Sequence, residues 1–136
     1  MIRPFSNFVP VQGSTVSAPG VFQSVSWNRP PGPPLVSVSN SSIGLQLHGT
    51  YVISAALRVE GAVGVTGFRS KIRFPRGDTS FWDPGALAAG EYRTLRLSCI
   101  FQYLDSRGGV SVEFTSDGGN GVLSGPDSNL SIAFLG

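Results

Sequence analysis

The clearest alternation of apolar and polar positions in this chain lies in residues 49–60. One side of the stretch is apolar throughout and consists of Tyr51, Ile53, Ala55, Leu57 and Val59. The other side includes Ser54, Arg58 and Glu60. Successive side chains of a strand point to opposite sides, so this alternation predicts a strand with one buried face. We expect the other apolar runs to pack on or beside it.

A second long strand is predicted at residues 92–103, where one face is again apolar and holds Leu95, Leu97, Cys99, Phe101 and Tyr103. Shorter runs predict further strands at residues 21–27, 35–39, 43–48, 110–114 and 129–135. Together with residues 66–74, discussed next, these runs make about eight strands.

The outward positions of the predicted strand at residues 66–74 are basic, with Arg69, Lys71 and Arg73. Charged side chains are typical of a sheet edge, where they oppose pairing with other chains. We therefore expect this strand to lie at an edge.

Proline, glycine and aspartate separate the predicted strands. Residues 28–34 are expected to form a loop, and residues 75–90 a long loop with one helical turn. Residues 105–109 are typical of a hairpin turn, and residues 117–121 of another turn. No segment of useful length has a helical period. The sequence therefore predicts an all-β domain, an antiparallel β-sandwich of the jelly-roll type.

The first 20 residues differ from the rest and predict an extended N-terminal arm, followed by a jelly-roll domain at residues 21–136. Prolines at three positions favour extended backbone. Phe5, Phe8 and Val9 are isolated apolar residues that could anchor the arm to a partner. A terminal tail with no binding role is the alternative.

The chain is poor in charge for its 136 residues, since only 13% are charged and 40% are hydrophobic. A surface with so few charges suits a protein that other subunits cover. The net charge of +2 and the lack of a basic stripe argue against nucleic-acid binding. No signal peptide and no apolar run long enough to span a bilayer is visible, so we expect synthesis in the cytoplasm and no membrane partner.

Residues with catalytic or metal-binding chemistry are few. His48 is the only histidine and Cys99 the only cysteine, so neither a histidine metal cluster nor a disulfide can form within the chain. Asp105, Asp117 and Asp127 match no calcium loop and are expected to form turns. We expect no catalytic site, no metal and no cofactor, and hence no enzyme.

Three segments carry a family resemblance. Residues 43–53 join a short strand to a long one through Gly49, Thr50 and Tyr51; residues 95–101 and 110–114 form a late strand pair; and residues 128–135 form a closing strand. In this order, over residues 21–136, the chain resembles the C1q/tumour-necrosis-factor jelly-roll superfamily. Leu130 and Ala133 depart from the usual closing motif.

This resemblance implies a compact homotrimer packed around a threefold axis. The core or trimer contacts would then come from Tyr51, Ile53, Leu97, Phe101, Phe114, Ile132 and Phe134. Bacteriophage virions also use small trimeric β-sandwiches. We therefore expect a decoration (cement) protein on the capsid exterior, which binds the major capsid protein of a phage head through its arm and trimer base. The alternative is a fibre tip or a receptor- or carbohydrate-binding module, with Trp82 and Tyr92 exposed on loops.

Overall fold

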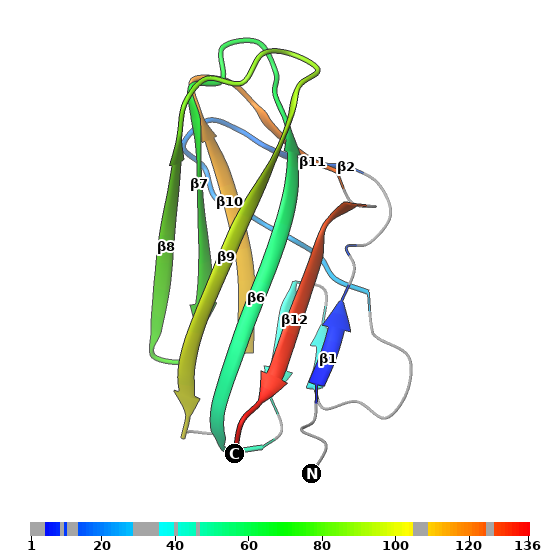
Figure 1. Ribbon diagram of the computed structural model, residues 1–136, viewed down its shortest axis with the longest axis vertical. Coiled ribbons are helices and arrows are strands. Elements are labelled where there is room, and N and C mark those ends of the chain that lie inside the picture. The colour runs from blue at the N-terminus through cyan, green and yellow to red at the C-terminus, as the bar shows by residue number, and fades with distance from the viewer. Residues whose placement is uncertain are drawn as a thin grey trace.

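The computed structural model describes residues 5–8, 10, 14–28, 36–39, 41–45, 47–104, 109–124 and 127–136. These residues form twelve strands in two antiparallel sheets that pack face to face (Figure 1). The predicted fold class, a jelly-roll β-sandwich, is confirmed.

The sheet nearer the viewer in Figure 1, here called the front sheet, is built around the longest predicted strand. Its strands are β1 (Phe5–Phe8), β2 (Ser14–Ser17), β6 (Gly49–Glu60), β9 (Tyr92–Tyr103), β11 (Gly121–Ser124) and β12 (Asn129–Phe134). β9 pairs with β6 along its whole length, while β12 and β11 share the other side of β6. β1 then adds to β12, and β2 adds to β11.

The second sheet, here called the back sheet, is centred on β10. Its strands are β3 (Gln23–Ser24), β4 (Val36–Ser39), β5 (Ser42–Leu45), β7 (Gly67–Phe74), β8 (Gly77–Pro84) and β10 (Gly109–Asp117). They run in the order β4, β5, β10, β7 and β8, with β3 paired to β10. The chain passes between the sheets from β9 to β10 and again from β10 to β11, and such crossings give a jelly roll its topology.

The core fills the space between the sheets, as the alternation of β6 and β9 requires. Six of the seven core or trimer candidates are buried: Tyr51, Ile53, Leu97, Phe101, Phe114 and Ile132. Phe134 is only partly buried, and its ring lies 5.2 Å from that of Tyr51. The Tyr51 ring also stacks on Phe101, so aromatic rings close the end of the core near the C-terminus.

Two of the strand predictions need correction on the back sheet. Residues 77–84, predicted as a loop, form β8, which pairs with β7 from end to end. β7 therefore lies between β10 and β8 and is no edge strand. β8 holds the edge instead, so the basic side chains of β7 do not serve to protect an edge.

One connection and one further strand also differ from the prediction. Strands β9 and β10 belong to different sheets and do not pair with each other, as a hairpin would require. Residues 105–108 of the predicted turn lie outside the described residues. Within residues 21–27 only Gln23–Ser24 forms a strand, although Val25 and Trp27 are buried beyond it. The predicted loop at residues 28–34 lies, except for Asn28, outside the described residues.

Candidate functional site

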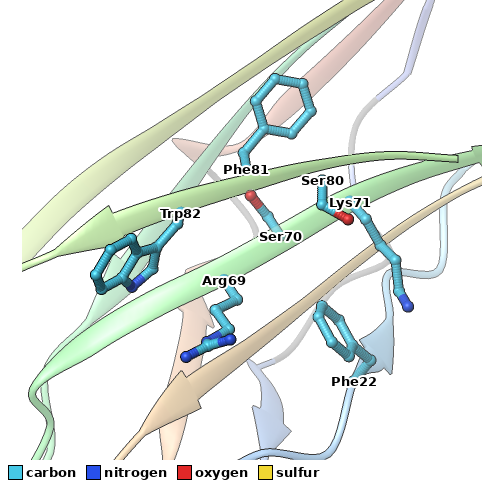
Figure 2. Close-up of a pocket in the computed structure, with 7 residues that line it drawn as sticks. All are labelled: Phe22, Arg69, Ser70, Lys71, Ser80, Phe81 and Trp82. Atoms are coloured by element: carbon cyan, nitrogen blue, oxygen red, sulfur yellow. The ribbon is translucent and has the colours of Figure 1, made fainter.

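The outer face of the back sheet carries a shallow groove that we call the Trp82 groove. Its volume is about 300 Å³, and it is lined by Phe22, Arg69, Ser70, Lys71, Ser80, Phe81 and Trp82. Strand register explains the arrangement, because β7 and β8 place Arg69 opposite Trp82 and Lys71 opposite Ser80. In Figure 2 these four side chains and Phe22 lie on one side of the strands, while Ser70 and Phe81 point to the other.

Aromatic rings and cations alternate in this groove. The Lys71 Nζ atom lies 4.0 Å from the centre of the Phe22 ring, and the Arg69 Cζ atom lies 5.9 Å from the centre of the Trp82 ring. Cations at such distances are attracted to the negative face of a ring. Trp82 is nevertheless 67% exposed, so most of its indole remains open to a ligand.

Carboxylates of the neighbouring strand β10 lie beside the cations on the same face of the sheet and orient them. Arg69 donates from Nε to Asp117 Oδ2 at 3.2 Å, and Lys71 Nζ lies 3.8 Å from Glu113 Oε2. Glu113 also accepts a bond from Arg73 at 3.3 Å, and its own side chain is only 10% exposed. The groove therefore holds two positioned cations whose charge is balanced only in part, beside an open indole.

The front sheet presents a different surface on its outer side, here called the front face. Register aligns three rows of outward residues across β12, β6 and β9: Ala133, Val52 and Ile100; Ser131, Ser54 and Ser98; and Asn129, Ala56 and Arg96. Ile100 is 69% exposed. These rows contain small or apolar side chains apart from Asn129 and Arg96, so the face can approach another surface closely.

The N-terminal residues are part of the front sheet where the structure describes them. Phe8 is 1% exposed and lies in the core of the domain, with its backbone opposite Leu130 of β12. Phe8 therefore packs within its own domain in this structure, and the capsid-binding role of the N-terminal segment stays a prediction. The backbone of Phe5 lies opposite Ala133, and Val9 lies outside the described residues.

The two exposed aromatic residues of the alternative prediction belong to strands, not loops. Trp82 is in β8 of the back sheet, and Tyr92 is in β9 of the front sheet. Tyr92 is 48% exposed, and the Arg58 Cζ atom lies 4.5 Å from the centre of its ring. Trp82 lines the groove of the back sheet and Tyr92 does not.

The residues with catalytic chemistry stay apart from one another. His48 is exposed and packs edge-on against Tyr103 at 5.4 Å. Cys99 is half-buried, and burial raises the pKa of its thiol. Within the described ranges no three His, Cys, Asp or Glu side chains gather as metal ligands would. The absence of a catalytic site stays a prediction.

Tyr51 is the other group with a shifted pKa. Burial raises the pKa of its hydroxyl. The hydroxyl donates a hydrogen bond to the Leu47 carbonyl at 2.7 Å. This bond fixes the chain just before β6 and has a structural role. The described part of the chain contains no helix of the length and hydropathy that a membrane crossing requires.

The sequence indicates the basic residues and the tryptophan of the groove, but it does not predict that they lie together. The basic face of residues 66–74 and the exposed Trp82 are both predicted, but strand β8, which carries Trp82 and pairs with β7, is predicted as a loop. The missed signal is the alternation within β8, where Thr79, Phe81 and Asp83 are half-buried and Ser80 and Trp82 are exposed.

The fold is the jelly roll of tumour-necrosis-factor-like proteins, as the comparisons with solved structures show. Murine APRIL at pH 5.0 superposes with a TM-score of 0.67 at 14% identity, over 98% of this chain and 100% of that chain. The PRD1 vertex protein P5 superposes with a TM-score of 0.63 at 15% identity, over 97% of this chain and 73% of its own. Eiger TNF from S. frugiperda gives 0.61 at 8% identity, over 97% and 92%.

No family model matches the sequence, and no curated protein matches it. At identities of 8–15% the structural likeness establishes the fold alone. The predicted resemblance to the C1q/tumour-necrosis-factor jelly roll is confirmed at that level, and similar structures include a protein of a phage vertex.

Proposed function

We propose that this chain is a structural virion protein, a homotrimeric decoration protein on the exterior of a phage head. The observation that carries the proposal is the front face, an open sheet surface of small and apolar residues in a chain with only 13% charged residues. The likeness to the PRD1 vertex protein P5 supports the setting, because that protein of the same fold belongs to a virion vertex.

The front face has the chemistry of a subunit interface. Its row of Ala133, Val52 and Ile100 is apolar, and the adjacent row of three serines has short side chains that let a second sheet come close. Apolar surface of this kind is costly in water, and burying Ile100 against a neighbour contributes about 1.5–3 kcal/mol. A homotrimer repeats that contribution at each of its interfaces.

The trimer base and the start of the chain are the proposed contacts with the shell, without Phe8 among the contact residues. Phe8 fills the core of its own domain, so Phe5 and Val9 remain as the contacts of the N-terminal segment. Three copies of a weak contact on one trimer act together through their high effective concentration. The major capsid protein of the head is then the partner.

The oligomer is tested by light scattering coupled to size exclusion. We expect a mass of about 43 kDa, three times the 14.3 kDa of one chain. Ile100→Arg places a charge in the interface and should give a folded monomer, since Ile100 contributes little to the core. Val63→Arg is the matched control, because Val63 is 87% exposed in the β6–β7 connection. A monomeric wild type at micromolar concentration contradicts the proposal.

Attachment is tested on heads that lack the protein, from the phage that encodes the chain. Wild-type trimer should restore full occupancy, counted by electron microscopy. The double variant Phe5→Ala, Val9→Ala should remain trimeric but bind poorly. Wild-type occupancy by this variant would leave the trimer base as the sole contact, and failure of the wild type to bind heads would refute the decoration role.

The alternative, a fibre tip or receptor-binding module, gains support from a specific observation. Trp82 is exposed beside Arg69 and Lys71 in a groove on the back sheet. This groove lies on the sheet opposite the front face, so a ligand there and trimer formation do not compete for the same surface.

A further inference from the structure

We propose that the Trp82 groove binds a carboxylated sugar unit, such as the hexuronate of an acidic polysaccharide. The inference goes beyond the decoration role, since it concerns a ligand other than the capsid. It rests on three properties of the groove: an open indole, two oriented cations with unused donors, and a size that suits a small ring.

The apolar half of the site is the indole of Trp82. A pyranose ring has two faces of C–H groups, which pack against a flat aromatic surface, and its hydroxyl groups lie around the edge. Trp82 lies on the edge strand β8 and is 67% exposed, so its indole does not contribute to the core. An aromatic ring open to solvent with polar groups beside it is the usual composition of a binding site.

The polar half consists of Arg69, Lys71 and Ser80. Arg69 uses Nε for Asp117, and within the described part of the chain its terminal nitrogens have no hydrogen bond. Lys71 Nζ is 3.8 Å from Glu113 Oε2, beyond hydrogen-bond distance, so among the described residues this carboxylate leaves the ammonium donors open to a ligand. Figure 2 shows the Arg69 guanidinium beside the Trp82 ring and Ser80 above Lys71.

These donors match a carboxylate better than a neutral hydroxyl. A guanidinium binds a carboxylate through two parallel bonds, which are stronger than bonds between neutral groups. Ser80 can exchange hydrogen bonds with the ring hydroxyls. A sugar that carries a carboxylate therefore uses the indole, the two cations and the serine at the same time.

Size and charge argue against larger partners. A volume of about 300 Å³ is at the lower limit of small-molecule sites. Asp117 and Glu113 lie beside Arg69 and Lys71 on the neighbouring strand and repel a chain of phosphates. Nucleic acids require a continuous basic track, and the net charge of the whole chain is only +2. One acidic ring, as part of a longer glycan, satisfies the site.

The test is a calorimetric titration of the trimer with a tetrasaccharide that contains glucuronate, beside the same tetrasaccharide reduced to neutral glucose units. We expect binding of the acidic form, at least about tenfold tighter than the neutral form, which corresponds to about 1.4 kcal/mol. Tryptophan fluorescence reports the site directly, because Trp27 is buried and Trp82 is exposed. Bound sugar should shield Trp82 from a soluble quencher.

Variants assign the contacts. Trp82→Ala should weaken binding of the acidic sugar at least about tenfold, and Trp82→Tyr should retain part of it because a flat ring remains. Arg69→Gln should remove most of the preference for the acidic form. Arg76→Gln removes the same charge from the β7–β8 turn, away from the groove lining, and should bind as the wild type does.

Several results would overturn the assignment. No binding, equal affinity for the acidic and neutral sugars, or unchanged affinity in both Trp82 variants would each do so. A single-stranded oligonucleotide that binds more tightly than the sugar would identify the groove as a nucleic-acid site. Circular dichroism of each variant ensures that lost affinity reflects a lost contact and not an unfolded domain.

Discussion

Replacement of Phe8 by alanine tests whether the N-terminal segment is an arm or part of the domain. Phe8 is 1% exposed within the core, and its removal leaves a cavity between the sheets. Truncation of a fully buried phenylalanine typically costs about 3–5 kcal/mol. Because β1 is a short terminal strand that can separate from β12 and relieve part of the strain, we expect about 3 kcal/mol.

Urea unfolding, followed by the fluorescence of the buried Trp27, measures this loss. The protein concentration must be equal in all samples, since the proposed trimer would unfold with a concentration-dependent midpoint. The midpoint should fall while the slope stays constant. Val21→Ala is the control, because Val21 directly follows the N-terminal segment but is 61% exposed, and its loss should stay below about 0.5 kcal/mol. A loss below about 1 kcal/mol for Phe8→Ala would mean that Phe8 lies outside the core and that the arm is free.

Three further predictions concern the rest of the domain. Gly118→Ala should cost at least about 2 kcal/mol more than Gly90→Ala in urea unfolding, because both glycines have a φ of 84° but only at Gly118 would a Cβ collide with the Gly64 carbonyl. Tyr51→Phe should reduce the loss of stability above about pH 10, since burial raises the pKa of Tyr51 and the folded state keeps a proton that the unfolded chain releases. The Cys99 thiol should react with a disulfide reagent at pH 8 at least about tenfold more slowly in the folded than in the urea-unfolded protein, because burial raises its pKa; equal rates would contradict this.

The sequence predicts the long strands because their alternation has few exceptions. β6 was predicted with its bounds at residues 49–60, and β9 at residues 92–103. Both strands place bulky apolar residues at every second position over their central part, so that a shift by one residue would expose the whole set. Their pairing with each other also follows from their equal length.

The four strands that were not predicted lack that signal for definite reasons. β1, β2 and β11 have only four residues each, and none alternates apolar residues with small or polar ones as the equally short β4 and β5 do. β8 buries Thr79 and Asp83 halfway beside Phe81, so its inward side is not apolar. β1 and β2 pair with strands more than a hundred residues away in the chain, and such partners leave no local pattern.

In the candidate site, too, the residue types are visible in the sequence but their spatial arrangement is not. Residue types alone indicated the basic positions of β7 and the aromatic Trp82, because exposed cations and an exposed tryptophan are unusual in a chain so poor in charge. Their proximity depends on the register of β7 with β8, in which Arg69 faces Trp82. Register is set by a turn at Pro75 and Arg76, whose composition resembles that of any loop.

The two outer faces of the sandwich differ in chemistry: the back sheet is charged, and the front face consists mainly of small and apolar residues. The back sheet holds the cations Arg69, Lys71 and Arg73, which face only the two carboxylates of Asp117 and Glu113 and therefore keep part of their charge for water or a ligand. The front face holds Ile100 and rows of small residues, which gain from contact with another protein. In the proposed trimer the front faces therefore turn toward neighbouring subunits and the back sheets turn outward. That orientation places one Trp82 groove of each subunit on the outside of the assembly, where three copies can engage one acidic glycan together.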